Sequence, residues 1–428
     1  MVRRLQFLVA GAVLVVIAFS TGADFLFFLV YLGVLVVGGS YVLTRYGLSD
    51  LEAGYTLDRL QAQVGENLRA TYTLRNTSRL PKLWLEAYNP STLPVPLPGR
   101  AIALGPRAER TWIARVPLVR RGHFRIDPLV VRTGDPFGLF EASATVGGGS
   151  AIIVYPRVES LPRWRLPPAQ VEGSRTSPER TLQTTPLVTS IRAYLPGDAY
   201  NRIHWKQSAR HQDLQVKEFD LEQTADLWVF LDLQREVQAG EGDESTLEAG
   251  VRVVASVVSR ALSENRAVGF SATAHRMTMI PADRGARQYQ KLMQLLAAVT
   301  ADGTSPLVEG LLRDLPRMRR GMTALVVTPS LERDWIRPLA TLRSRGVGVT
   351  VCLLDALAYA DHPPRVPSPG VAHPPLDGDP RREARLQAAR NVRHALAEYD
   401  LPVHVVVPAR PLGELLLSRG PAGRPARV

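Results

Sequence analysis

The densest group of side chains that could do chemistry lies between residues 197 and 210. It combines a turn, regularly spaced cations, a histidine, a tryptophan and a hydroxyl: Gly197, Asp198, Arg202, His204, Trp205, Lys206, Ser208 and Arg210. Ser, His and Asp side chains that meet can act as nucleophile, base and orienting acid. Arg and Lys bind phosphates, carboxylates or acidic protein surfaces. This group is therefore suited either to hydrolysis or to recognition, and we call residues 191–222, which contain it, the signature segment.

The three cations of the signature segment converge in either regular backbone conformation. In a helix, Arg202, Lys206 and Arg210 stand four residues apart on one face, and in a strand they share a face with His204 and Ser208. The cations could bind an anionic partner, or they could pair with nearby carboxylates and pin the turn onto the next domain. Both interpretations are carried forward.

Catalysis by the signature segment lacks supporting motifs. Neither a nucleophile elbow nor a Gly-rich oxyanion loop accompanies Ser208, and the chain has no P-loop, dinucleotide-binding or metal-type Cys/His pattern. We therefore expect a protein that is not an enzyme, with a hydrolase using His204 and Ser208 as the alternative. His362 and His373 lie in a Pro-rich stretch without further ligands, which argues against a metal site there.

Net charge gives a second alternative. The chain has 52 Lys and Arg against 40 Asp and Glu, a formal charge of +12. Binding of nucleic acid or another polyanion through Arg202, Lys206 and Arg210 is therefore conceivable. However, the cations are spread along the chain instead of forming one basic run, so no nucleic-acid partner is expected. The single cysteine, Cys352, cannot form an internal disulfide.

Two apolar runs open the chain and predict a membrane hairpin. They cover residues 5–19 and 25–43, and about 20 helical residues cross a bilayer. Arg3 and Arg4 precede the first run, Arg45 follows the second, and the turn between them has no Lys or Arg. The positive-inside rule then places both ends, and the soluble domains, in the cytoplasm. A cleaved signal peptide is the rival interpretation, but a second span follows at once.

The next hundred residues have the period of β-strands. Apolar and polar residues alternate in short runs separated by Gly, Pro, Asn and Ser: 70–74, 83–87, 110–115, 123–126, 129–132 and 152–155. This pattern predicts an antiparallel β-sandwich-like domain. Within it, Asp135–Phe140 has the composition of a turn with two aromatic anchors, and we interpret it as a structural corner.

From residue 223 onward, apolar strands alternate with amphipathic helices. Strands are predicted at 227–232, 268–274, 277–280, 325–328, 347–354 and 403–407, and helices at 245–263, 286–299, 306–318, 335–344 and 381–399. Such alternation is typical of a mostly parallel sheet covered by helices on both faces.

These patterns divide the 428 residues into several parts. We predict a transmembrane helical hairpin at 1–48, a β-sandwich-like domain at 50–158, a linker or strap at 159–190, the signature segment at 191–222, an α/β domain at 223–418 and a disordered tail at 419–428.

The signature segment also resembles a known family. The runs Tyr194–Asp198, Arg202–Lys206, Ser208–Arg210 and Val216–Phe219 look like the signature of the bacterial domain-of-unknown-function-58 family. Upstream, residues 120–122, 135–140 and 154–156 and the membrane hairpin resemble it too. His204 stands where the family commonly has Asp, which weakens the case for a catalytic carboxylate.

The resemblance implies a von Willebrand factor A-like α/β domain after the signature. In that fold a divalent metal binds through an Asp-x-Ser-x-Ser strand end, a Thr loop and a later Asp. Asp232 matches the first Asp and Thr304 the Thr loop, but Gln234 and Glu236 replace the two Ser residues and residues 328–330 lack the last Asp. We therefore expect no cofactor. The alternative is Mg²⁺ at Asp232 and Thr304, where the metal-binding pattern is incomplete.

The resemblance also implies partners. Genes of this family commonly neighbour those of MoxR-type AAA+ ATPases and transglutaminase-like membrane proteins. The implied role is a membrane-anchored adaptor or scaffold that works with such an ATPase in protein assembly or maturation. A metal-dependent enzyme using Asp232 remains an alternative.

Overall fold

A computed structural model describes the chain as two compact units. It describes residues 2–162, 164, 188–195, 200, 203–211, 213–219, 226–274, 278–362 and 380–416. Unit 1 comprises Met1–Arg157 with Met293–Val299, and unit 2 comprises Val158–Leu292 with Thr300–Val428. The predicted tail 419–428 and most of the predicted linker 159–190 lie outside the described residues.

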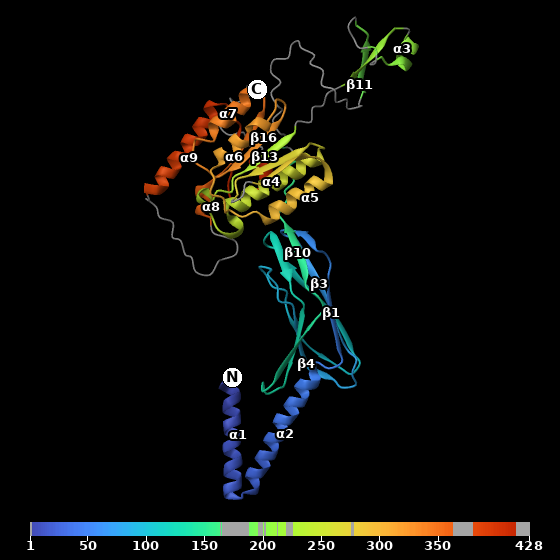
Figure 1. Ribbon diagram of the computed structural model, residues 1–428, viewed down its shortest axis with the longest axis vertical. Helices are drawn as coiled ribbons and strands as arrows, with labels where there is room; N and C mark the ends of the chain where they lie inside the picture. The colour runs from blue at the N-terminus through green and yellow to red at the C-terminus, as the bar shows by residue number, and fades with distance from the viewer. Residues whose placement is uncertain are drawn as a thin grey trace. The chain divides into compact units, whose positions relative to one another are not determined.

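Unit 1 begins with two consecutive helices, α1 (Val2–Thr21) and α2 (Asp24–Gly47) (Figure 1). They contact each other near the turn, where the Phe19 and Phe27 rings meet edge to face at 5.3 Å. Within the described part of the chain, α2 is the one helix long and apolar enough to cross a membrane, with a mean hydropathy of 2.3. The apolar part of α1, Val9–Thr21, is shorter than a standard span, so the expectation of two spans is met in full only by α2.

Ten strands follow in unit 1 and form three small sheets with the orders β1-β3-β6, β2-β10-β7 and β5-β4-β8-β9. Their bounds are β1 Leu51–Leu57, β2 Gln61–Gln63, β3 Asn67–Asn76, β4 Lys82–Tyr88, β5 Arg100–Leu104, β6 Glu109–Pro117, β7 Gly122–Ile126, β8 Leu129–Gly134, β9 Glu141–Val146 and β10 Ser150–Tyr155. All six predicted strand runs fall within these strands.

One hydrophobic core joins the three sheets of unit 1. Alternate residues of β3 point inward and are buried, from Leu68 through Tyr72 to Leu74. The Tyr72 ring stacks on Trp112 of β6 at 5.1 Å, which explains the choice of aromatic residues at facing positions. The strands of unit 1 pair antiparallel, as predicted for this domain, except that β2 pairs with β10 in parallel. β2 is only three residues long and has no alternation from which its direction could be predicted.

Unit 2 is built on a six-stranded sheet with the order β15-β14-β13-β16-β17-β18. Its strands are β13 Leu227–Leu231, β14 Val268–Ala272, β15 Thr278–Asp283, β16 Thr323–Thr328, β17 Gly348–Leu354 and β18 Val403–Val406. Every pairing is parallel except that of the edge strand β15. The mostly parallel sheet predicted from the alternating pattern is confirmed.

Helices cover both faces of this sheet. They are α4 Thr246–Ser263, α5 Gly285–Ala298, α6 Leu307–Asp314, α7 Ile336–Ser344, α8 Ala356–Ala360, α9 Pro380–Glu398 and α10 Leu412–Leu415 (Figure 1). α4 packs on β13 and β16, where Gly250 leaves room for Leu231 and Leu354. On the other face, residues of α6, α7 and α9 share one core with Trp228 and Phe230. Because these strands are buried on both faces, their sequences are continuous apolar runs.

The first residues of the predicted linker dock on the α/β sheet domain. Leu161 and Trp164 are buried, and the Glu159 carboxylate accepts a hydrogen bond from the Leu412 amide at 2.9 Å. The Glu159 amide in turn donates to the Ser256 hydroxyl of α4. This stretch therefore acts as a strap over the domain, one of the two roles expected for it.

Gly303, between α5 and α6, is required by close backbone packing. A Cβ atom there would lie 2.0 Å from the Thr273 carbonyl oxygen and 2.9 Å from that of Leu233. Neither backbone atom can move without disturbing its strand, so we expect Gly303→Ala to destabilise unit 2 by on the order of 3 kcal/mol. Thermal unfolding of the full chain in detergent measures this. Gly413→Ala, whose Cβ would make only an ordinary contact, is the control, and equal melting temperatures for the two variants would contradict the prediction.

Candidate functional site

The signature segment folds as a helix packed on a two-stranded sheet. β11 (Val188–Ala193) pairs antiparallel with β12 (Gln215–Phe219), and α3 (Trp205–His211) lies between them in sequence. Ile203 and Val216 are buried and face each other across an isolated bridge. Of the two conformations considered for residues 205–210, the helix is the one observed. Gly197, Asp198 and Arg202 lie outside the described residues.

Ser208 and His204 hold the helix and strand together. The buried Ser208 hydroxyl donates to the His204 carbonyl at 3.2 Å and accepts from the Gln215 amide at 2.8 Å. The His204 Nδ1 accepts from the Gln207 amide at 3.1 Å, as an N-cap side chain does. Both groups are thus engaged with backbone, and the described contacts include no hydrogen bond between the imidazole and the hydroxyl. The geometry does not support a Ser–His nucleophile pair.

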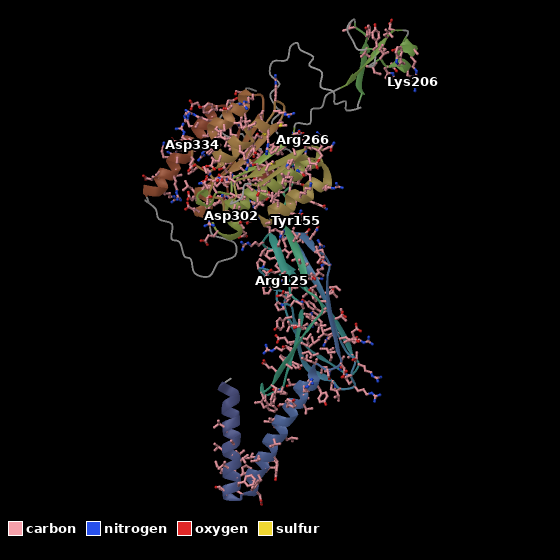
Figure 2. The ribbon with its side chains drawn as sticks, in the orientation of Figure 1. Arg125, Tyr155, Lys206, Arg266, Asp302 and Asp334 are labelled. Carbon is pink, nitrogen blue, oxygen red and sulfur yellow. The ribbon has the colours of Figure 1, made fainter. Side chains whose placement is uncertain are left out.

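The outer face of α3 is exposed and carries both aromatic and cationic groups. Trp205 is 67% exposed and Tyr200 72% exposed. Lys206 and Arg210 are exposed at i and i+4, so they share one face of α3. Lys206 is labelled in Figure 2. We call the three exposed α3 residues Trp205, Lys206 and Arg210 the α3 face. Exposed Trp, Tyr and Arg side chains are typical of protein recognition surfaces, since they supply large contact areas and charge.

A second group of polar side chains lies at the carboxyl edge of the α/β sheet. β14 and β16 flank β13 on opposite sides, so the chain reverses its direction of winding at β13 and β16. Ligands of open α/β sheets bind in the crevice at such a point. Asp232 follows β13, Thr273 follows β14, and Thr328 ends β16. The sheet order therefore brings together residues that are far apart in sequence.

The Asp232 carboxylate is buried and accepts three hydrogen bonds. It accepts from the Thr328 hydroxyl at 2.6 Å, from the Thr273 hydroxyl at 3.4 Å and from the Gln234 amide at 3.1 Å. Burial raises the pKa of Asp232 above its ordinary value, and these hydrogen bonds only partly offset the loss of solvation. The threonines were not singled out from sequence as its partners.

The donor set around Asp232 does not fit a divalent cation. Hard cations take six or more oxygen ligands, usually including several carboxylates. Among the described residues no group of three or more His, Cys, Asp or Glu could hold a metal, Glu236 and Thr304 are exposed, and Gln234 pairs through its backbone with Gly303. The buried Gln234 Oε1 has no hydrogen-bond partner, but one amide oxygen does not replace missing carboxylates. We therefore assign no step to a metal here.

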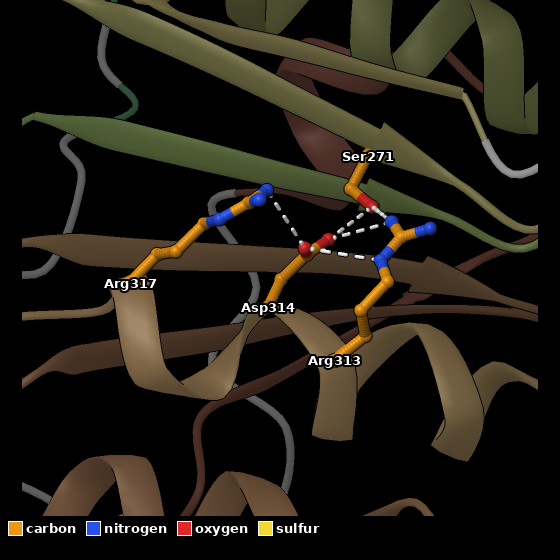
Figure 3. A network of polar contacts seen from close by, with 4 residues as sticks. All are labelled: Ser271, Arg313, Asp314 and Arg317. Carbon is orange, nitrogen blue, oxygen red and sulfur yellow. Dashed lines mark hydrogen bonds and ion pairs between the residues drawn. The ribbon is translucent and has the colours of Figure 1, made fainter.

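A third polar cluster was missed by the sequence analysis. Asp314, at the end of α6, is fully buried and accepts hydrogen bonds from Ser271 of β14 at 2.6 Å and from Arg313 at 2.9 Å (Figure 3). Arg317 adds an ion pair at 3.3 Å. Burial alone would raise the pKa of Asp314, but the arginines and Ser271 outweigh it and hold the pKa below its usual value. An Arg-Asp pair on a helix is too common a pattern to predict burial.

The two buried aspartates should show opposite dependences on pH. Unfolded, both titrate near pH 3.9, at about the ordinary Asp value. Asp314 has a lowered folded pKa, so its contribution is present above that pH and is lost as pH falls through the folded pKa. Asp232 has a raised folded pKa, so its contribution is full below that pH and is lost as pH rises through the folded pKa.

We expect Asp314→Asn to cost about 1.5–3 kcal/mol at neutral pH and little in acid, because the lost hydrogen bonds involve a charged partner. For Asp232→Asn the trend should be reversed: the wild type should lose stability relative to this variant as pH rises. Melting temperatures of the three proteins between acid and neutral pH measure both slopes. Parallel curves for the two variants would contradict the assignments.

Comparison with known proteins confirms the expected family resemblance. The family model described as "Protein of unknown function DUF58" matches residues 190–362, from β11 through β17. YeaD, an uncharacterised protein of Bacillus subtilis, is 25% identical over 356 residues, which cover 78% of this chain and 86% of YeaD. An uncharacterised protein of Mycobacterium tuberculosis is 26% identical over 173 residues, and the chain spans only about half of it (53%).

A solved structure adds nothing to this assignment. The CARDB domain of a Pyrococcus furiosus protein, crystallised with di-metal ions, aligns with 24% of this chain and 92% of its own at 12% identity and a TM-score of 0.19. A similarity this low carries no argument. The match of the family model shows instead that residues 190–362 are similar to the DUF58 family, proteins of unknown function.

Proposed function

We propose that the protein is a membrane-anchored adaptor or scaffold that binds a MoxR-type AAA+ ATPase through the α3 face and acts with it in protein assembly or maturation. The observation that carries the proposal is the α3 face itself, where Trp205 and two cations are exposed on a helix whose polar inner residues are used to fix its position. A rigid, exposed aromatic and cationic helix suits an acidic protein partner.

The α/β sheet domain supports a binding role for the chain. We infer that it is von Willebrand factor A-like, because its central strand ends in Asp232 at the reversal of the sheet order. The carboxylate there is occupied by hydroxyl and amide donors, which leaves a closed, hydrogen-bonded edge instead of a reactive acid. A transglutaminase-like membrane protein is the second partner that the family resemblance suggests.

Two alternatives give different outcomes in solution. If Asp232 is part of a metal-dependent enzyme, calorimetry should detect heat of Mg²⁺ binding to the wild type and none with Asp232→Asn. A nucleic-acid-binding protein requires an affinity for duplex or single strands that falls steeply with salt and depends on Lys206 and Arg210. No observation on the described residues favours either one over the adaptor.

We expect replacement of the α3 face to weaken ATPase binding without unfolding the protein. Trp205→Ala and the double variant Lys206→Glu/Arg210→Glu should each lower affinity for a purified MoxR-type ATPase of the source organism by roughly tenfold or more, because exposed Trp and Arg dominate such interfaces. Affinity is measured on the full chain in nanodiscs, with and without nucleotide, beside its melting temperature.

The double variant Arg333→Glu/Arg337→Glu provides the matched control, because both arginines are exposed elsewhere in unit 2 and the change in net charge equals that of Lys206→Glu/Arg210→Glu. It should leave binding unchanged. If the wild type does not bind the ATPase in either nucleotide condition, the adaptor proposal is wrong. If the control variant lost as much affinity as the α3-face variant, binding would depend on net charge and not on a specific face.

For the anchor, we propose two spans with the soluble units in the cytoplasm. α2 has the length of a span, α1 is apolar over Val9–Thr21, and the cations lie at the outer ends of the pair. A slightly short helix can cross a bilayer that thins around it.

A cysteine at Leu60 tests this topology. Leu60 is 55% exposed, and the natural Cys352 is fully buried, so it gives little background labelling. We expect Leu60→Cys to react with a membrane-impermeant thiol reagent in inverted membrane vesicles and not in intact cells. Cys352→Ala in the same protein removes the residual background. Labelling in intact cells would place unit 1 outside the cytoplasm and contradict the topology.

A further inference from the structure

The last two turns of α2 are packed into the β domain of unit 1. Ser40, Thr44 and Gly47 are buried, and α2 contacts β4, β8 and β9. A Cβ on Gly47 would lie 2.7 Å from Thr133 of β8, so the helix and the strand approach as closely as glycine allows. The Lys82 ammonium donates to the Tyr46 carbonyl at 2.5 Å and satisfies an open group at the end of α2.

The Asp135–Phe140 turn meets α2 at the level of Tyr41. The Phe140 ring lies 5.7 Å from the Tyr41 ring in an edge-to-face contact. The buried Asp135 carboxylate accepts hydrogen bonds from the Phe137 and Phe140 amides, which fixes the shape of the turn. Phe137 is left 62% exposed at the tip. The turn is therefore a structural corner, as expected, but it also presents an aromatic side chain outward.

The length of α2 fixes the depth of this contact. About 20 helical residues, at 1.5 Å each, are needed to cross the ~30 Å hydrocarbon layer. Counted from Phe25, where the apolar run begins, they end at about Thr44. Tyr41, and with it the Asp135–Phe140 turn, then lies at or within the boundary of the hydrocarbon. A tilted helix covers less depth per residue and would place the turn deeper still.

The end of the β domain at this level has the chemistry of a membrane interface. Exposed apolar side chains gather at the turn and at the start of β4: Leu80, Leu83, Trp84 and Phe137, between 40% and 63% exposed. Trp84 lies against Gly134, beside the turn. Arg45 and Arg79 are exposed nearby in sequence. Aromatic residues with Lys or Arg are enriched where a protein meets lipid headgroups.

We propose that this end of the β domain, formed by the Asp135–Phe140 turn and the start of β4, inserts its exposed apolar side chains into the headgroup region of an anionic bilayer. This membrane seat rests on the proposed anchoring by α2, and it adds a second, interfacial contact between unit 1 and the membrane. It does not depend on an ATPase partner. The proposed partner of this apolar surface is thus lipid. The position of α2 in the bilayer sets how deep the surface lies.

Nitroxide labels on single cysteines test the membrane seat. In the full chain with Cys352→Ala, reconstituted in nanodiscs of phosphatidylethanolamine and phosphatidylglycerol, labels are placed by Phe137→Cys and, as a second reporter, Leu83→Cys. Val34→Cys in the middle of α2 and Leu60→Cys on the β1–β2 connection are the deep and aqueous references, each more than half exposed. The accessibility of each label to oxygen and to a water-soluble nickel chelate gives its depth.

We expect the labels at 137 and 83 to lie between the references, with nickel-chelate accessibility reduced several-fold below that at position 60. If the label at 34 is buried in lipid while those at 137 and 83 match position 60, the membrane seat is wrong and the anchor stands. If the label at 34 is itself accessible to the chelate, the anchor fails. Low accessibility to both reagents at 137 and 83 would mean that protein covers the surface, which also overturns the proposal.

Discussion

The central constraint on unit 2 is that β13 has no face in water. All five of its residues are buried between strands on both sides and helices on both faces. Polar groups where it ends are therefore costly to leave unpaired, at about 1–3 kcal/mol for each buried group. Thr328 and Thr273 donate to Asp232, and the Gln238 amide donates to its carbonyl. The hydrogen bonds at this edge of the sheet are therefore a consequence of the burial of β13.

The same constraint explains which parts of unit 2 were predictable. Continuous apolar runs predicted β13, β16 and β17, and helical periodicity predicted α4, α5 and α9, because burial imposes those patterns directly. α8 and α10 were missed, since they have only five and four residues. Asp232 follows a strand, as the resemblance implied, but its threonine partners depend on strand order, which no local pattern contains.

In unit 1 and the signature segment, predictability followed length and amphipathic alternation. Alternation marked six of the strands, whereas β2 is too short to show it and pairs in an unexpected direction. Around His204 and Ser208, residue types suggested catalysis, but hydrogen-bond direction decides their role. The Ser208 proton goes to a backbone carbonyl, and Nδ1 of His204 accepts an amide. Sequence spacing cannot distinguish a nucleophile from a helix cap, because both use the same side chains.

The unbroken passage of α2 into the β domain has a mechanical consequence. The helix runs from Asp24 to Gly47 without interruption. Its last turn packs against Thr133 and accepts a hydrogen bond from Lys82. Only three residues connect α2 to β1, and the contacts of Gly47 with Thr133 and of Tyr46 with Lys82 oppose rotation of the helix end relative to the strands. A torque or sideways force applied to the β domain would therefore be transmitted to α2 and would change the tilt of that helix. The end of α2 and the β domain of unit 1 should therefore move together as one rigid body.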